Sequence, residues 1–228
     1  GALGRDGNAE LLRDALAAAG VDTSHVSTVD RPTGSAMILL TPDGDNSIVV
    51  SPGANMAVDV AAAEAVSAIW LAADVLVLNL ESPLDTVVHV IERAHAAGVR
   101  VLLNAAPAQV LPPATLACCD PLVVNEYEAR VVRGDPTIPP DAPFELLATR
   151  LRDAGAPTVV ITLGAEGALV ADDTGITRVP AYRVDAVDTT GAGDAFVGAV
   201  ATELSRGLPL SEAVKFATAM SAVAVQRL

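Results

Sequence analysis

Two apolar segments near the start of the chain are separated by residues typical of a turn. The segments cover residues 33–40 and 46–51, and Pro42-Asp43-Gly44-Asp45 lies between them. This arrangement predicts a β-hairpin. The first segment is apolar on both faces, as in strands covered on both sides by substrate, core or a partner subunit. We expect residues 33–51 to form a β-hairpin lid, preceded by an amphipathic helix near residues 6–19.

The pattern changes at about residue 58, where helical periodicity begins to alternate with short apolar strands. The predicted helices cover residues 58–71, 84–97, 126–133, 144–154, 192–205 and 210–227. The predicted strands cover residues 74–80, 99–104, 122–124, 158–163, 168–171 and 177–180. This alternation indicates an α/β fold with a doubly wound, mainly parallel sheet and helices on both faces. We expect its core to comprise residues 1–32 and 52–228, with ligands at the carboxyl ends of the strands.

Composition narrows the classes of partner. Apolar residues make up 51% of the chain, and its formal charge of −14 is not offset by any Lys/Arg cluster. These features argue against nucleic acid and anionic lipid as partners, and no apolar run reaches the length of a membrane span. Cys118 and Cys119 are adjacent, which suits neither an ordinary disulfide nor a metal site. We therefore expect a cytoplasmic protein in which helix N-termini or metal ions attract any anionic ligand.

The strongest chemical motif is the run Asp188-Thr189-Thr190-Gly191-Ala192-Gly193-Asp194, which leads into a predicted helix. Small residues allow a ligand to approach the backbone, and the first N–H groups of a helix have no internal acceptor, so Gly191, Ala192 and Gly193 predict an anion hole. Asp194 would accept a proton from a hydroxyl that attacks a phosphate. The alternative is a glycine turn in which Asp194 only interacts with the helix dipole. Neither a Walker nor a Rossmann glycine motif is present.

This run, extended to Val187–Phe196, resembles the C-terminal signature of ribokinase-like sugar kinases of the PfkB family. Further segments resemble the same family in the same order, namely Thr33-Gly34, Gly53-Ala54-Asn55, Leu80-Glu81-Ser82-Pro83, Asn104-Ala105-Ala106-Pro107-Ala108, Asn125-Glu126-Tyr127-Glu128 and Ile161-Thr162-Leu163-Gly164. The resemblance covers essentially the whole chain and implies a ribokinase-like fold. The family's first strand, its Gly-Gly loop and its last loop have no counterpart here, so we expect a fold truncated at both ends.

On the sugar side, the resemblance implies that Glu81 hydrogen-bonds sugar hydroxyls at the end of a strand. The alternative is a solvated loop acid. Ala36, Ile38 and Val50 of the hairpin would form an apolar cover over the sugar, which excludes water from the reaction.

On the nucleotide side, Asn125 and Glu128 have the spacing of a capping box at the start of a helix. The resemblance implies that they also orient Mg²⁺ and the phosphates, largely through water. Both roles can coexist.

The segment after strand 158–163 would support the phosphates and ribose of the nucleotide, although an ordinary tight turn is the alternative. Its residues are Thr162, Leu163, Gly164, Ala165, Glu166 and Gly167. Thr218 falls where the family lines the adenine pocket, with helix packing as the alternative. Asp188 and the carbonyl of Thr190 match the family's K⁺ site, with a simple turn cap as the alternative.

Together these features predict ATP-dependent phosphorylation of D-ribose at its 5-hydroxyl, with Mg²⁺ bridging phosphates and K⁺ beside the anion hole. The alternatives within the family are fructose, 2-keto-3-deoxygluconate or a nucleoside as the substrate. A sugar- or nucleotide-binding module without catalysis is the alternative outside it. The apolar hairpin predicts a homodimer in which the lids pair.

Overall fold

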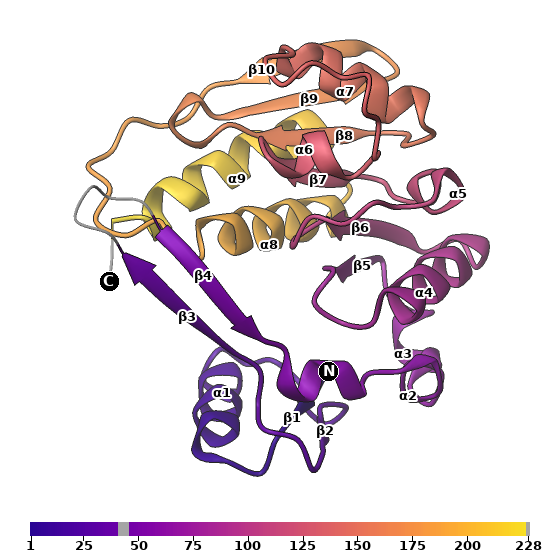
Figure 1. Cartoon of the computed structure of the whole chain (residues 1–228), viewed down its shortest axis with the longest axis vertical. Coiled ribbons are helices and arrows are strands. Elements are labelled where there is room, and N and C mark those ends of the chain that lie inside the picture. Colours follow the sequence, from indigo (N-terminus) through magenta and orange to yellow (C-terminus); the bar gives the residue numbers. More distant parts are fainter. Residues whose placement is uncertain (41–45, 227–228) are drawn as a thin grey trace. The chain divides into compact units, whose positions relative to one another are not determined.

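A computed structural model describes residues 1–40 and 46–226, with the side chains of residues 38–40 and 46–48 left out of the description. The described chain forms two compact units (Figure 1). The first comprises Gly1–Ile69 and Glu81–Val90, and the second comprises Trp70–Leu80 and Ile91–Leu228. The hairpin predicted over residues 33–51 belongs to the first unit.

The first unit opens with a short strand and the predicted helix. The helix α1 (Gly7–Ala18) is capped by Asp6, whose Oδ1 accepts the N–H of Ala9 at 3.0 Å. Strand β1 (Ala2–Leu3) pairs in parallel with β2 (Ser27–Thr28). The helix was predicted from the sequence, whereas strands of two residues are too short to show a periodic pattern.

The predicted hairpin is confirmed. Strand β3 (Ser35–Leu40) pairs antiparallel with β4 (Asn46–Ser51), with Ala36 opposite Val50 and Ile38 opposite Ile48. The predicted turn residues and the side chain of Ile38 lie outside the description. Among the described side chains of the hairpin, the apolar residues Met37 and Val49 are exposed, with 64% and 60% of their surface accessible.

The prediction of one helix over residues 58–71 was wrong. The chain instead forms two short helices there, α2 (Val60–Glu64) and α3 (Ser67–Trp70), and a 3₁₀ helix η1 (Gly53–Ala57) precedes them. Helix α2 ends where the N–H of Val66 bonds the carbonyl of Ala63, the three-residue spacing of a 3₁₀ turn. No glycine or proline marks this break, so the local pattern does not reveal it.

The second unit contains a six-stranded sheet in the order β10-β9-β8-β7-β6-β5. Its strands are β5 (Val75–Leu78), β6 (Arg100–Asn104), β7 (Leu122–Asn125), β8 (Val159–Thr162), β9 (Ala168–Asp172) and β10 (Gly175–Val179). Strands β5 to β8 are parallel, whereas β9 and β10 are antiparallel. The predicted α/β fold with a mainly parallel sheet is confirmed.

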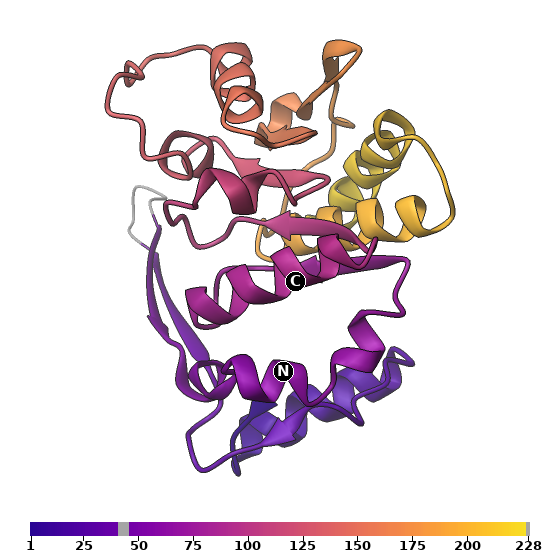
Figure 2. The same ribbon diagram turned by 90° about the vertical axis from the view of Figure 1, so that its right-hand side faces the viewer.

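Helices cover both faces of this sheet, as Figure 2 shows. On one face Val123, Val160 and Val170 pack with Phe196 and Val214 of the last two helices. These helices are α8 (Ala192–Ser205) and α9 (Leu210–Ala224). Helix α7 (Phe144–Asp153) packs against β8 and β9. Because successive strand residues point to opposite faces, burial on both sides explains the continuous apolar runs at 122–124, 159–161 and 168–171.

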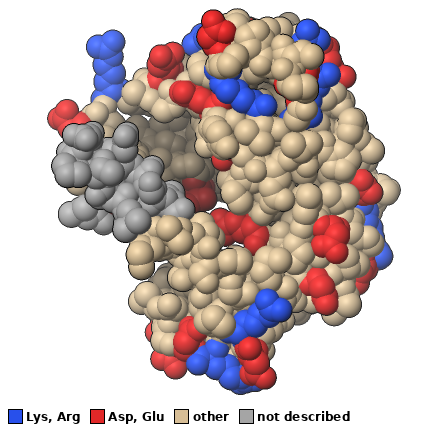
Figure 3. All heavy atoms as spheres, in the orientation of Figure 1, with Lys and Arg blue, Asp and Glu red and all other residues tan. Residues whose placement is uncertain are grey.

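The remaining helices are short, except for α4. Helix α4 (Leu84–Ala96) closely matches its prediction, and α5 (Pro113–Leu116) was not predicted. Helix α6 (Glu128–Val131) is shorter than the predicted 126–133. Among the described residues, no helix combines the length and the apolarity needed to cross a membrane. On the face shown in Figure 3, acidic and basic side chains are interspersed rather than gathered in a basic patch.

Candidate functional site

A cavity of about 280 Å³ lies within the first unit, at the base of the hairpin. Its walls include Gly34, Ala36, Val50, Asn55 and Glu81. Three side chains that were predicted to contact the sugar, from three separate parts of the sequence, therefore line one space.

Asn55 is the polar neighbour of Glu81 in this cavity, and it was not among the predicted site residues. Its Nδ2 donates to Glu81 Oε2 over a long 3.5 Å, and its backbone N–H bonds the carbonyl of Pro52. An amide and a carboxylate together present donors and acceptors, which is what neighbouring hydroxyl groups require. The Gly53-Ala54-Asn55 segment was noted in the sequence, but nothing local indicated that its Asn faces Glu81.

In the second unit, Gly191 is the N-cap residue of α8 and has the left-handed conformation, with φ of 75°. The N–H of Ala192 bonds the carbonyl of Thr189, and the N–H of Ala195 bonds that of Gly191. The N–H groups of Gly193 and Asp194 lie less than four residues after Gly191, the first intrahelical acceptor, so they have no partner within the helix and remain available to an anion. Asp194 itself is exposed in this first turn.

The last helix fixes the position of this turn. Ser221 Oγ donates to the carbonyl of Ala192 at 3.0 Å. At the end of α9, the carbonyl of Val225 accepts the N–H groups of Val187 and Asp188 at 2.7 and 3.2 Å. These contacts hold the loop before α8 at both ends, so the protein itself fixes the position of the first turn of this helix.

The side chain of Asp188 caps the turn that follows it. Its Oδ1 accepts the N–H of Thr190 at 2.8 Å, and this bond, followed by one from the Thr190 hydroxyl, lowers the pKa of the Asp188 carboxyl. The carboxylate is therefore held in its charged form in the loop before α8. A carboxylate with carbonyl oxygens is an oxygen donor set that fits a hard cation.

The capping box at Asn125 and Glu128 is present in full. Asn125 Oδ1 accepts the N–H groups of Tyr127 and Glu128 at 3.0 and 2.8 Å, and Glu128 Oε2 accepts the N–H of Asn125 at 2.7 Å. Asn125 thus has only its Nδ2 donor left for new contacts, which a cation does not bind. The arrangement fits Mg²⁺ held through water and not by direct coordination. Among the described residues, no group of three or more His, Cys, Asp or Glu side chains could hold a metal.

Glu128 is only 7% exposed, and this burial raises the pKa of its carboxyl despite the opposing bond from Asn125. The charged form is disfavoured in the folded state, so this group lowers stability as the pH rises above the ordinary pKa of a glutamate.

Glu128→Gln keeps an oxygen for the Asn125 N–H and removes the charge. Its free energy of unfolding at pH 7 should equal or exceed that of the wild type in urea titrations.

If Glu128 orients Mg²⁺ through water, the same variant should nevertheless lose activity, by about 10- to 100-fold in kcat/KM for ATP. Glu126→Gln, at the exposed neighbouring position, is the matched control and should behave as the wild type. Unchanged kinetics in Glu128→Gln would leave the capping box as the whole role of this residue.

The segment after β8 forms a 3₁₀ turn, η2 (Gly164–Glu166), closed by a 2.8 Å bond from the N–H of Leu163 to the carbonyl of Gly167. Thr162 Oγ1 donates to the carbonyl of Val124 at 3.4 Å. Gly164, with φ of 52°, has open space where a Cβ would lie. Glu166 Oε2 lies 3.6 Å from Arg178 Nη1.

Leu163 is buried and Ala165 is exposed. Thr218 is 5% exposed, and its Oγ1 donates to the carbonyl of Lys215 in the preceding turn of α9. The packing interpretation of Thr218 therefore accounts for its hydroxyl.

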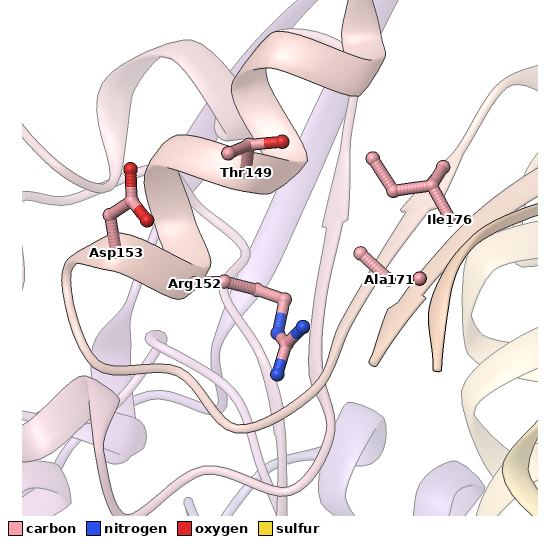
Figure 4. A pocket seen from close by; sticks show the side chains of 6 residues that line it. Thr149, Arg152, Asp153, Ala171 and Ile176 are labelled. Carbon is pink, nitrogen blue, oxygen red and sulfur yellow. The ribbon is translucent and has the colours of Figure 1, made fainter. Parts of the chain in front are cut away.

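A second hollow, of about 410 Å³, contains none of the predicted site residues. Figure 4 shows it between α7, with Thr149, Arg152 and Asp153, and the β9–β10 hairpin, with Ala171 and Ile176. Arg152 Nη1 donates to the carbonyl of Asp172, which fastens α7 to β9.

Comparison with known proteins identifies the family to which the chain belongs. The family profile described as "pfkB family carbohydrate kinase" matches residues 1–228. A ribokinase of Schizosaccharomyces pombe is 36% identical over 231 residues, which cover 100% of this chain and 73% of the relative. A deoxyribokinase of Salmonella typhi is 35% identical over 208 residues, which cover 90% of this chain and 68% of the relative.

Among solved structures, Arabidopsis thaliana ribokinase complexed with ribose and ATP superposes with a TM-score of 0.88. The two sequences are 30% identical, and the match covers 100% of this chain and 75% of the other. The chain belongs to the pfkB family of carbohydrate kinases. Within that family it is a ribokinase-type sugar kinase, a phosphotransferase with an alcohol group as acceptor.

Proposed function

We propose that the protein transfers the γ-phosphoryl group of ATP to the 5-hydroxyl of D-ribose. The observation that supports this most directly is the cavity in the first unit that Glu81, Asn55, Ala36 and Val50 line. The carboxylate and the amide suit neighbouring sugar hydroxyls, and the two apolar side chains suit the carbon face of the ring. Ile38, whose side chain is not described, would extend this apolar cover.

In the proposed reaction, Asp194 accepts the proton of the 5-hydroxyl as its oxygen attacks the γ-phosphorus. A new O–P bond forms while the bond from phosphorus to the β–γ bridging oxygen breaks, and that electron pair leaves on ADP. The N–H groups of Gly193 and Asp194 stabilise the negative charge on the transferred group. No covalent intermediate with the protein is needed.

The nucleotide would be supported by Thr162, the turn from Leu163 to Gly167, and Thr218. Asn125 and Glu128 would orient Mg²⁺ through water, and Asp188 with the Thr190 carbonyl would hold K⁺. When bound, these cations neutralise phosphate charge in a chain whose own formal charge is −14.

We place the reaction in the cytoplasm, a proposal that the free thiols of Cys118 and Cys119 support.

We also propose that the hairpin pairs with that of a second copy. Met37, Val49 and Val50 are about 60% exposed, and a two-stranded hairpin cannot bury both of its faces alone. Light scattering at micromolar concentration should give twice the monomer mass for the wild type and the monomer mass for Val49→Lys. Ile176→Lys, an exposed apolar strand position outside the hairpin, should remain dimeric. A monomeric wild type would contradict this proposal.

The function is tested by a coupled ADP-release screen over ribose, deoxyribose, fructose, 2-keto-3-deoxygluconate and adenosine, each with and without K⁺. Ribose should give the highest kcat/KM, and K⁺ should raise it. Deoxyribose belongs in the screen because one relative is named a deoxyribokinase. ADP release with another substrate alone would move the proposal to that substrate, and release with none would favour a binding module without catalysis.

A further inference from the structure

Asp6 makes more contacts than a helix cap requires. Its Oδ1 accepts the N–H of Ala9 at 3.0 Å, which caps α1, and also the hydroxyl of Thr33 at 2.7 Å. Its Oδ2 accepts the backbone N–H of Thr33 at 2.8 Å. A residue that served only as the cap would use the first of these bonds. The other two connect the start of α1 to Thr33, which lies two residues before β3.

Thr33 is the buried end of this connection. It is only 4% exposed, and its Oγ1 also accepts the N–H of Gly4 at 2.9 Å. Gly4 itself tolerates no side chain, because a Cβ there would lie 2.5 Å from the carbonyl oxygen of Arg31. The entry into the hairpin is therefore held by three hydrogen bonds and a close backbone contact. Thr33 itself and the next residues, Gly34 to Ala36, line the cavity that contains Glu81.

The segment that follows the hairpin is held against Pro32, the residue directly before Thr33. The N–H of Ala54 bonds the carbonyl of Pro32 at 2.8 Å. A Cβ on Gly53 would lie 2.3 Å from that carbonyl oxygen, and a Cβ on Gly34 would lie 3.0 Å from the carbonyl oxygen of Pro52. The two ends of the hairpin thus meet backbone to backbone, with Asn55 immediately after them. A shift of Thr33 would be transmitted to both walls of the cavity.

We propose that Asp6 is a positioning residue for sugar binding, which acts through Thr33 by fixing the two ends of the hairpin in the place that the sugar cavity requires. This proposal rests on the proposed function of the cavity. Asp6 does not line the cavity, so it acts by holding the cavity walls in place before the sugar binds. Walls held in place in advance lose less conformational freedom on binding, which strengthens affinity without any new contact.

The test compares Asp6→Asn with Asp59→Asn. Asp59 also caps a helix of the first unit, α2, where its Oδ1 accepts the N–H of Ala62 at 2.8 Å. Asn caps helices about as well as Asp, so both variants keep their caps. At position 6, however, the amide has one oxygen instead of two. With that oxygen kept at the cap, its NH₂ group takes the place of Oδ2 and faces the backbone N–H of Thr33. Asp6→Asn should raise KM for ribose about tenfold and leave KM for ATP unchanged.

Asp59→Asn should match the wild type in both constants. Equal KM for ribose in Asp6→Asn and the wild type overturns the proposal, as does an equal rise in both variants. If Asp6→Asn does not fold, Thr33→Ser and Thr33→Val replace it, since serine retains the hydroxyl and valine lacks it. Rescue by serine but not valine supports the proposal, and equal KM values for the two overturn it.

A readout without catalysis separates this proposal from the proposed function. Hydrogen–deuterium exchange at the amides of residues 33–37 should be faster in Asp6→Asn than in Asp59→Asn, with ribose absent. If the wild type releases no ADP with any sugar, the proposed function fails while the exchange result still tests the Asp6–Thr33 connection. Equal exchange in the two variants overturns that connection whatever the activity.

Discussion

Asp194→Asn should lower kcat for sugar phosphorylation by about 100- to 10,000-fold, the usual contribution of a general base. Asparagine has nearly the shape of aspartate but cannot accept the proton of the attacking hydroxyl. Asp194 is exposed in the first turn of α8, so the change should not disturb the core. ADP release in a coupled assay measures the loss, and ATP titration by calorimetry should show that nucleotide binding is retained.

The control for this variant is Glu212→Gln, which also removes an acid from the first turn of a helix, α9, in the same unit. Both changes remove a favourable interaction with a helix N-terminus, which is worth less than about 1 kcal/mol at an exposed position. The control should therefore keep wild-type kcat. Comparable activity in Asp194→Asn and Glu212→Gln would show that Asp194 is only a helix-dipole residue and would remove the general base from the proposed mechanism.

Gly167→Ala should destabilise the protein by about 3 kcal/mol, since left-handed strain and a backbone clash act together. Gly167 has φ of 100°, and a Cβ there would lie 2.0 Å from the carbonyl oxygen of Val179 and 2.6 Å from the N atom of Ala181. The atoms in the way belong to the backbone, so no side-chain rotation relieves the contact. Urea unfolding followed by circular dichroism measures the change.

Gly164→Ala is the matched control in the same turn. Gly164 has φ of 52°, but a Cβ there would meet nothing within 4 Å, so only the left-handed strain of about 1 kcal/mol applies. Equal losses in the two variants would show that the close approach of Val179 is not the reason for glycine at position 167. A raised KM for ATP in Gly164→Ala, with stability near that of the wild type, would support the role of this turn in nucleotide binding.

Elements with strong local signals were predicted closely. Helix α4 and strand β6 end within about one residue of their predicted limits, because periodicity and the change to a turn are properties of neighbouring residues. The break between α2 and α3 was missed because it depends on packing and not on any glycine or proline.

The residues of the candidate site likewise fall into those that local sequence patterns predict and those that only the folded chain brings together. The run from Asp188 to Asp194 and the Asn125–Glu128 pair are contiguous or three residues apart, so their turn, helix start and capping box could be read locally. Asn55 and Glu81 are 26 residues apart, and no pattern in either segment indicates that the amide bonds the carboxylate.

The sequence by itself determined the class of protein, the doubly wound α/β fold and the glycine-rich helix start, since each depends on short-range patterns. Only the tertiary structure decided what holds these parts in place. It assigned the support of α8 to Ser221 and Val225, and the hold on the hairpin to Asp6 and Thr33. Those bonds join residues 27 or more positions apart, and such pairings are fixed by how the whole chain packs and not by local preference.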